Sequence, residues 1–465
     1  MIKTENKWEN MNTIAHAARP NVPEPNTDLP AGAAPRTVSK RELNKVVLAS
    51  VVGSFVEWFE FSVYGYLAAT LGKVFFSSSS ESVQLIASLA AFAIAFLSRP
   101  FGGLLFGPLG DKFGRKRVLT ATIILMAGAT FGIGLIPSYA TIGIAAPILL
   151  VCMRLLQGLS AGGEASGAAI FVAEYSPDKN RTAVTSWIEV GCISGFFFGA
   201  AIATTLTFFF TTEQITEWAW RLPFWLALPL GSIGLYIRNH LEETPAFEAM
   251  RANKVKPKVD WAYLFSTHRG ALLQSSGMII VTNVTLFTVI TYIPTYLVST
   301  VHMTTSNGLL LSLGPQFFLI CMIPILGIVA DRIGRRTMML IGSVAVAVFA
   351  VPCFHILMTG GIAAKVGSLL VLNLCLAALL SCILCAVPAL FNIKVRFTGM
   401  ALSYNVSVAM FAGTAPLLNA WLIGKTGDPL VPAYYLIFGA VVGIVALLYS
   451  PEMARKPMRG DAPSA

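Results

Sequence analysis

The chain has 465 residues, of which 55% are hydrophobic and only 12% are charged, and its formal net charge is +10. Its mean hydropathy is +0.70. Soluble domains carry about 25% charged residues, so this composition excludes an ordinary water-soluble enzyme or binding module. The basic residues are scattered along the chain and form no single stripe, so the charge does not indicate a nucleic-acid-binding surface.

The first 42 residues contain five prolines and no apolar run. This composition is typical of a disordered tail, and it lacks the apolar core of a cleaved signal peptide. We therefore expect residues 1–42 to form a disordered tail.

Twelve apolar runs follow, and each is close to the roughly 20 residues that a helix needs to cross a bilayer. They cover about 46–72, 84–107, 117–136, 142–172, 184–210, 222–238, 270–299, 308–330, 338–357, 365–391, 399–423 and 432–450. The run at 222–238 is the shortest. The sequence therefore predicts an all-α membrane protein with twelve transmembrane helices.

A short motif occurs twice, 220 residues apart, each time between two apolar runs. The first copy reads Gly107-Pro-Leu-Gly-Asp111-Lys-Phe-Gly114-Arg115-Lys116, and the second reads Gly327-Ile-Val-Ala-Asp331-Arg-Ile-Gly334-Arg335-Arg336. A repeat at half the chain length indicates two similar halves, as in secondary transporters. We expect six-helix bundles at 43–239 and 269–450, a polar linker at 240–268 and a tail at 451–465.

The motif residues have a predicted mechanical role. Gly114 and Gly334 suit tight turns, while Asp111 and Asp331 stand where they can accept bonds from helix-start amides or pair with an arginine. Arg181 and Arg396 occupy matching positions in the two halves. We expect a gating set that holds the bundles together when the inside is closed, made of Gly107, Asp111, Gly114, Arg115, Arg181, Asp331, Gly334, Arg335 and Arg396. The alternative is that these charges set topology only.

Charge asymmetry predicts the orientation. Only Arg99 and Arg154 lie inside helices, and one set of alternate loops holds only four basic residues, Lys73, Arg221, Lys365 and Lys425. The rest of the 33 Lys and Arg residues fall in the tails and the other loops. The positive-inside rule then places both termini and the motif loops in the cytoplasm.

Charged side chains within the apolar runs are the candidates for chemistry, because each costs about 2.5–3.5 kcal/mol to insert. A buried carboxylate that gains and loses a proton as solvent access changes can couple transport to a proton gradient. The candidate proton-coupling carboxylates are Glu57, Glu60, Glu164 and Glu189. Fixed ion pairs with Arg99 or Arg154, or side chains that reach out to the interface, are the alternative.

The charge balance favours a zwitterionic substrate. In the first half these four carboxylates outnumber Arg99 and Arg154, which suits a ligand with a positive group better than a di- or tricarboxylate. Trp58, Phe59 and Tyr64 could receive a quaternary ammonium while an arginine binds the carboxylate. The alternative for these aromatic side chains is a lipid-facing position.

Other site classes find little support in the sequence. All seven cysteines lie in apolar segments, and Cys382-x-x-Cys385 has no histidine partners, so we expect buried thiols and no metal site. We recognise no cofactor motif and no nucleophile–base pair, so an enzyme is not expected. A sensor on a transporter fold and a passive facilitator remain as alternatives.

The paired motif resembles the signature loop of the major facilitator superfamily. Glu57-Trp58-Phe59-Glu60-Phe61, Arg154-Leu-Leu-Gln157-Gly158 and Glu174-Tyr-Ser-Pro177 are similar to its metabolite:proton symporter branch, and Thr282-Asn283-Val-Thr285 resembles the carriers of proline and glycine betaine within that branch. Residue 60 departs from the family, which usually has Asp there.

This resemblance implies a two-bundle carrier with a central site in a bacterial inner membrane. It implies proton symport of a zwitterion such as proline or glycine betaine, or, as the alternative, of an organic acid such as oxoglutarate, citrate or shikimate. The substrate-binding candidates are Trp58, Tyr64, Arg99, Arg154 and Asn283. The expected partners are protons, a small molecule and the lipid bilayer, and the oligomeric state is left open.

Overall fold

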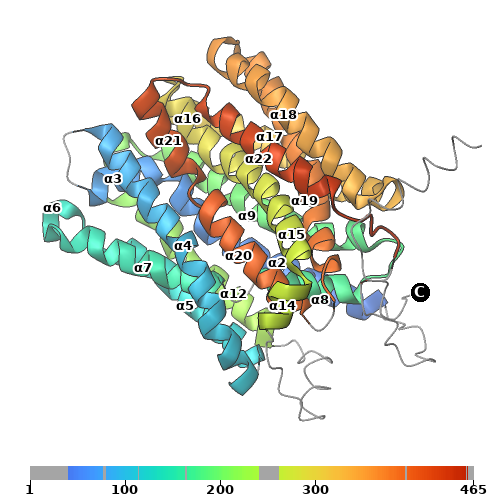
Figure 1. Cartoon of the computed structure of the whole chain (residues 1–465). Helices are drawn as coiled ribbons and strands as arrows, with labels where there is room; N and C mark the ends of the chain where they lie inside the picture. The colour runs from blue at the N-terminus through green and yellow to red at the C-terminus, as the bar shows by residue number, and fades with distance from the viewer. Residues whose placement is uncertain are drawn as a thin grey trace, which may run out of the picture.

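The described part of the chain is almost entirely helical in the computed structural model (Figure 1). The structure describes residues 40–76, 80–113, 115–162, 165–239, 261–392, 395–456 and 458. The predicted tail at 1–42 and the linker at 240–268 lie mostly outside these residues. A helix, α2, begins at Lys40, and a short helix, α14, occupies the end of the linker.

The first half of the chain, residues 40–239, contains long helices that are interrupted at a few points. They are α2 (Lys40–Tyr66), α3 (Ala68–Phe75), α4 (Glu81–Phe113), α5 (Arg115–Leu135), α6 (Tyr139–Ile142), α7 (Ala145–Ala161), α8 (Ala165–Tyr175), α9 (Arg181–Phe209), α10 (Thr212–Gln214), the π-helix η1 (Ile215–Ala219), α11 (Arg221–Trp225) and α12 (Ala227–Asn239).

The second half, residues 261–458, repeats this pattern of long helices. They are α14 (Trp261–Thr267), α15 (Arg269–Leu286), the π-helix η2 (Phe287–Tyr292), α16 (Ile293–Ser299), α17 (Thr305–Ile333), α18 (Arg335–Thr359), α19 (Ile362–Ala389), α20 (Arg396–Ser407), the π-helix η3 (Val408–Ala412), α21 (Ala415–Thr426) and α22 (Val431–Leu448).

The lengths and compositions of these helices confirm a multi-pass membrane protein. Within the described residues, nine helical segments of 18 to 31 residues are apolar enough to cross a bilayer, and two shorter apolar helices cover Thr120–Leu135 and Ala145–Ala161. The predicted run at 222–238 corresponds to α11 and α12, which are not among these eleven. The count of twelve spans therefore stays a prediction.

Large apolar side chains remain exposed on the outside of the molecule. They include Leu104, Phe208, Phe209, Leu273, Phe317 and Val348, each exposed by more than half. A soluble protein rarely exposes so much apolar surface, whereas lipid tails solvate it. The same helices bury their small and polar residues toward one another.

Glycines set the closest helix contacts in the first half. A Cβ atom on Gly158 would lie 1.7 Å from the Ala95 carbonyl oxygen, and one on Gly162 would lie 1.9 Å from the Arg99 carbonyl oxygen, so α4 and α7 touch backbone to backbone. A Cβ atom on Gly191 or Gly195 would lie 2.4 Å or 2.6 Å from a carbonyl oxygen of α2, so α9 and α2 also pack closely. This spacing of small residues is the usual means of close helix packing in membranes.

Helix α9 lies between the two halves of the chain. It packs against α2 in the first half and against α17 in the second half. In Figure 1, α5 and α7 lie at one edge of the molecule and α18 at the opposite edge. Residues on α2, α4, α9, α17 and η2 therefore occupy the central region.

Candidate functional site

The second motif copy forms a turn that joins α17 to α18. Gly334 has a φ of 108°, the unusual backbone angle expected at this position. The carboxylate of Asp331 accepts hydrogen bonds from the backbone N–H groups of Thr182 at 3.1 Å and Ala183 at 2.9 Å, in the first turn of α9. A residue of the second half therefore caps a helix of the first half.

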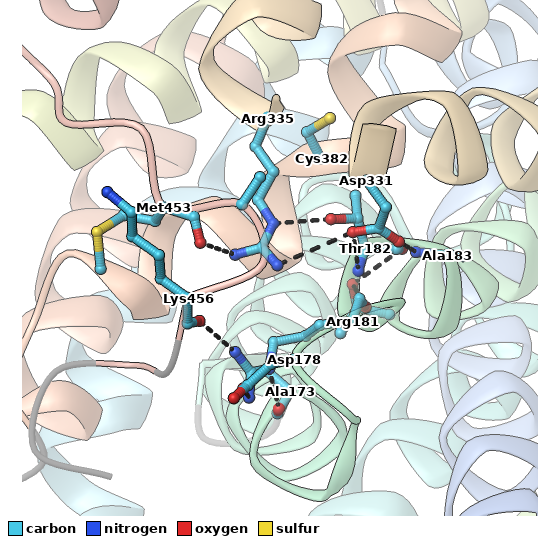
Figure 2. Close-up of polar contacts among 12 residues, drawn as sticks. Ala173, Asp178, Arg181, Thr182, Ala183, Asp331, Arg335, Cys382, Met453 and Lys456 are labelled. Carbon is cyan, nitrogen blue, oxygen red and sulfur yellow. Dashed lines mark hydrogen bonds and ion pairs between the residues drawn. The ribbon is translucent and has the colours of Figure 1, made fainter. Parts of the chain in front are cut away.

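Arg335 extends this connection between the halves (Figure 2). Its Nε donates to the Thr182 hydroxyl at 2.7 Å, and its Nη1 donates to the Met453 carbonyl at 3.1 Å. Its Nη2 lies 3.9 Å from Asp331 Oδ1. The guanidinium is almost fully buried, so these bonds form away from bulk water, where they are stronger.

The predicted partners Arg181 and Arg396 also lie at this end of the helices. Arg181 forms an ion pair with Asp178, and its other nitrogens donate to the carbonyl of Ala173 at 2.9 Å and to that of Lys456 at 3.2 Å (Figure 2). Arg396, on α20, donates to Glu174 Oε1 on α8 at 2.8 Å. We call this region, built around Asp331, Arg335, Arg181 and Arg396, the motif face.

Residues 451–456 and Met458, which sequence analysis did not single out, complete the motif face. Glu452 accepts bonds from the backbone N–H groups of Arg335 and Arg336, both at 3.0 Å, and so caps α18. Met458 is 2% exposed and clusters with Ala173 of the first half and Ala389 of the second. The acidic residue directly after the last apolar run was the signal that could have indicated this segment.

The first motif copy cannot be compared in the same detail. Gly107 and Asp111 lie on α4 and Arg115 on α5, but the side chains of Asp111 and Arg115 are outside the described part of the structure, as is Gly114 entirely. The carboxylate candidate Glu164 is also outside the described residues.

Glu57 and Arg99 form an ion pair in the centre of the first half. Arg99 Nη2 lies 3.0 Å from Glu57 Oε1, with both side chains more than nine-tenths buried. The guanidinium carbon of Arg99 lies 5.6 Å from the ring centre of Trp58 and 5.7 Å from that of Phe96. Its Nε and Nη1 have no hydrogen-bond partner among the residues that the structure describes. This guanidinium thus retains donors for a further acceptor.

Glu60, one turn after Glu57, belongs to a separate hydrogen-bonded chain. The hydroxyl of Thr130 on α5 lies 2.5 Å from Glu60 Oε2, and Gln157 Nε2 on α7 donates to the same hydroxyl at 2.6 Å. Gln157 Oε1 in turn accepts from Arg154 Nη1 at 2.7 Å. Glu60 is therefore connected to Arg154 through two neutral side chains.

The remaining bonds of Arg154 go to its own half of the chain. Its Nε and Nη2 donate to the carbonyls of Ala91 at 3.3 Å and Phe92 at 3.1 Å. The ring of Tyr64 covers the guanidinium, with its centre 4.2 Å from Cζ, and the Tyr64 hydroxyl donates to the Ser88 carbonyl at 3.1 Å. Both Arg154 and Tyr64 are thus held in place by groups around them.

The three aromatic side chains considered for an ammonium group do not converge. Trp58 faces Phe196 and Phe287, Phe59 stacks on Phe55, and Tyr64 covers Arg154. Their positions on one helix place them about 100° apart for each residue, so neighbours in sequence face different partners. The ammonium site expected from all three therefore does not form in this structure.

An aromatic cluster instead fills the boundary between the halves. Phe287, in η2, has its ring centre 5.1 Å from that of Phe96 and 6.0 Å from that of Trp58. Tyr404, on α20, lies close enough to Arg99 and Glu189 to interact with them electrostatically. Arg99 is therefore reached by side chains of both halves.

Two further candidates lie buried near this cluster. Glu189 lies on α9 with about 5% of its surface exposed, and it interacts with Cys192 one turn later. Asn283 lies on α15, where its amide nitrogen donates to the Ile279 carbonyl at 3.1 Å.

The second half adds uncharged polar groups to the central region. Within the described part of the chain, buried side-chain atoms without a hydrogen-bond partner occur in Thr288, Thr291, Gln316, Asn405 and Asn419. Buried polar groups normally bind a protein group, water or a ligand, so these atoms can each accommodate a further partner. π-Helical segments such as η2 and η3 also occur often at functional sites.

The halves also touch on the other side of the aromatic cluster. The Tyr66 hydroxyl at the end of α2 donates to the Ile290 carbonyl at 3.2 Å and accepts from Gln316 Nε2 at 3.0 Å. Contacts between the halves therefore lie on both sides of the aromatic cluster.

Comparison with known proteins agrees with this architecture. Residues 46–400 match the family model of the Major Facilitator Superfamily. A proline/betaine transporter of Salmonella typhimurium is 42% identical over 434 residues, covering 91% of this chain and 86% of that protein. The glycine betaine/proline/ectoine/pipecolic acid transporter OusA of Dickeya dadantii is 43% identical over 432 residues, with the same coverage of each chain.

Solved structures show the same fold. The proton:xylose symporter XylE, bound to a sugar analogue, superposes with a TM-score of 0.73 at 17% identity, covering 91% of this chain and 98% of that one. XylE from E. coli in a partially occluded inward-open conformation gives a TM-score of 0.67 at 16% identity, with 88% and 100% covered. The chain belongs to the Major Facilitator Superfamily and is a multi-pass membrane transporter.

Proposed function

We propose that this protein is a proton-coupled symporter that imports a small zwitterion such as proline or glycine betaine across a bacterial inner membrane. The buried Glu57–Arg99 pair carries this proposal, because it lies beside the aromatic cluster at the boundary of the halves. The names of the relatives that cover 91% of the chain support the choice of substrate.

In the proposed coupling, the substrate carboxylate and Glu57 compete for the guanidinium of Arg99. Arg99 has two nitrogens that bind no other described residue, and these suit a substrate carboxylate. The positive group of a zwitterion would lie against Trp58 and the neighbouring rings. A substrate that engages Arg99 weakens its hold on Glu57, which then binds a proton instead of remaining a buried charge.

Glu60 is the second proton-binding candidate, and Glu189 and Glu164 follow it. A small cavity of about 20 Å³ is lined by both Glu57 and Glu60, with Gly53 on α2 and Met126 on α5 among its other lining residues. Its volume suffices for a single water molecule, which would let a proton reach the two carboxylates.

We further propose that the motif face is cytoplasmic and that 43–239 and 269–450 act as two six-helix bundles joined by the 240–268 linker. Both termini would then be cytoplasmic, in line with the distribution of basic residues. Impermeant thiol reagents added to intact cells should miss cysteines placed at 111–117 and 331–336 and reach those placed at 77–81. Labelling of the motif positions from outside would contradict this orientation.

Transport would require the contacts of Asp331, Arg335, Arg181 and Arg396 to break as the cytoplasmic side opens, and those of Tyr66 to break as the other side opens. This alternation around a central site is the general behaviour of carriers with repeated halves.

A substrate panel in proteoliposomes with an imposed pH gradient tests the function. We expect proline or glycine betaine to accumulate against its gradient, and accumulation to stop when a protonophore removes the pH gradient. Accumulation of oxoglutarate, citrate or shikimate instead would favour the organic-acid alternative. Equilibration without accumulation would indicate a passive facilitator.

A further inference from the structure

Thr130 occupies an unusual position between Glu60 and Gln157. Its hydroxyl oxygen lies 2.5 Å from Glu60 Oε2, 2.6 Å from Gln157 Nε2 and 2.9 Å from the Met126 carbonyl oxygen. A hydroxyl has one proton to donate and two lone pairs that accept. The three neighbours therefore compete for a fixed number of bonds.

Gln157 donates to one of these lone pairs whether Glu60 is ionised or protonated. Its amide orientation is fixed, because Oε1 accepts from Arg154 Nη1 at 2.7 Å and Nε2 must then point toward Thr130. One proton and one lone pair of Thr130 remain, and they face the Glu60 carboxyl group and the Met126 carbonyl.

The two protonation states of Glu60 use these remaining bonds differently. When Glu60 is ionised, the Thr130 hydroxyl donates its proton to the carboxylate. When Glu60 is protonated, the carboxyl group donates to the Thr130 lone pair, and the Thr130 proton turns to the Met126 carbonyl. In each state the Thr130 hydroxyl donates its own proton and accepts from Gln157, so the proton always has an acceptor although the residue is only 1% exposed.

We propose that Thr130 is a positioning residue whose rotating hydroxyl lets Glu60 bind and release its proton without leaving a buried polar group unsatisfied. Gln157 anchors that hydroxyl and ties it to Arg154. The inference deepens the proposed symport function and rests on its assignment of proton binding to the first helix.

The charged side chains near Glu60 lie on its own helix and on helices that pack near it. Glu57 lies one turn earlier on α2 and is paired with Arg99 of α4, while Arg154 of α7 is reached through Gln157. On α5, Thr130 supplies the hydrogen bond to the carboxylate.

The test compares Thr130→Val, which removes the hydroxyl at nearly constant shape, with Thr130→Ser, which keeps it. Thr204→Val is the matched control, because the Thr204 hydroxyl is also buried on a long helix but bonds only to the Ala200 carbonyl one turn earlier, at 2.7 Å. All are measured beside the unaltered protein in proteoliposomes, as uptake driven by a pH gradient and as counterflow, over a range of pH.

We expect Thr130→Val to move the pH midpoint of uptake upward by about one unit, a tenfold change in the proton equilibrium, because the charge-assisted bond to the ionised form is the stronger of the two that are lost. Counterflow, which needs no net proton movement, should stay within a few-fold. Thr130→Ser and Thr204→Val should behave like the unaltered protein.

Infrared difference spectroscopy gives a readout that does not depend on transport. A protonated carboxyl band that disappears in Glu60→Gln should shift in Thr130→Val, because the carboxyl group has lost its acceptor, and should keep its position in Thr130→Ser and Thr204→Val. If Thr130→Val does not fold, Thr130→Ala replaces it in both measurements.

An unchanged pH midpoint together with an unchanged carboxyl band would overturn the role of Thr130. Failure of the proposed function would be seen separately, as an absence of proton-driven accumulation in the unaltered protein, and the infrared comparison would still decide the position of Thr130.

Discussion

The protein contains two buried networks of charged and polar side chains that differ in what they connect. At the motif face, Asp331 and Arg335 of the second half bind the start of α9 in the first half. In the centre, the chain from Glu60 through Thr130 and Gln157 to Arg154 stays within the first half. The first network must break when the halves separate there, whereas the second can persist and change only its protonation.

This difference teaches that burial alone does not assign a role to a charged residue. Arg335 and Arg154 are both almost completely buried and both bond to backbone carbonyls. Only the partners distinguish them, because those of Arg335 belong to segments that must move relative to each other in a carrier. Substitutions in the two networks should therefore affect different steps of transport.

The largest expected effect is on proton coupling. Glu60→Gln should abolish accumulation against a gradient, because the amide cannot bind and release a proton, while counterflow continues since it needs no net proton movement. Uptake with an imposed pH gradient measures this. Glu217→Gln, an exposed carboxylate on η1, is the control and should accumulate substrate normally. Full accumulation by both Glu60→Gln and Glu57→Gln would move the coupling site to Glu189 or Glu164.

The second effect is on exchange between conformations. Asp331→Asn should weaken the cap on α9, because the amide group presents only one acceptor to two N–H donors, and the loss of a bond to a charged acceptor corresponds to about tenfold in the closed-to-open equilibrium. We expect the transport rate to fall strongly and the ligand affinity to change by only a few-fold. We expect the same of Asp111→Asn at the first motif copy.

Alkylation of Cys382, a buried thiol near Asp331 and Arg335, measures this opening in a chain that keeps no other cysteine (Figure 2). Asp428→Asn is the control, because the Asp428 carboxylate bonds to the Leu430 amide within its own turn. Slow alkylation of Cys382 in Asp331→Asn, equal to that in the control, would count against a closing role for Asp331.

The sequence predicted the elements of both networks better than their connections. The repeated motif and the i, i+3 spacing of Glu57 and Glu60 identified the relevant side chains, because charge in an apolar run is costly and therefore informative. The pairing of Glu57 with Arg99, and of Glu60 with Thr130, depends on how α2, α4 and α5 pack, which no local pattern specifies. Thr130 is one of many threonines in apolar runs, so sequence offered no signal for it.

At the motif face, too, the sequence predicted the side chains better than their partners. The sequence predicted that Asp331 would accept bonds from helix-start amides or pair with an arginine, but it did not indicate which helix. The observed amides are those of Thr182 and Ala183 in the first half, which carry no sequence signature. Glu452 and Met458 lie far from the motif in sequence and reach it only because α22 ends beside the turn at Gly334.

A smaller effect is expected from the segment after α22. Met458→Asp places a charge among apolar partners from both halves, so the closed motif face should lose stability, and Cys382 should react a few-fold faster. Met458→Leu keeps the apolar contact and should leave the alkylation rate unchanged. Equal rates for Asp and Leu at this position would show that the segment does not contribute to closure.

The smallest effect concerns the pair between Arg396 and Glu174. Glu174 is partly exposed, so the solvent-screened coupling energy should be only about 0.5–1 kcal/mol. A double-mutant cycle with Arg396→Gln and Glu174→Gln, read as Cys382 alkylation, measures it. A coupling energy near zero would place Arg396 outside the closing contacts.

The most direct test of two separate roles puts Glu60→Gln and Asp331→Asn through the same two assays, counterflow and accumulation on a pH gradient. The account predicts that Glu60→Gln keeps counterflow and loses accumulation. It predicts that Asp331→Asn slows both, with the final accumulation ratio preserved at long times. Loss of counterflow in Glu60→Gln together with a lost accumulation ratio in Asp331→Asn would contradict the separation of the two networks.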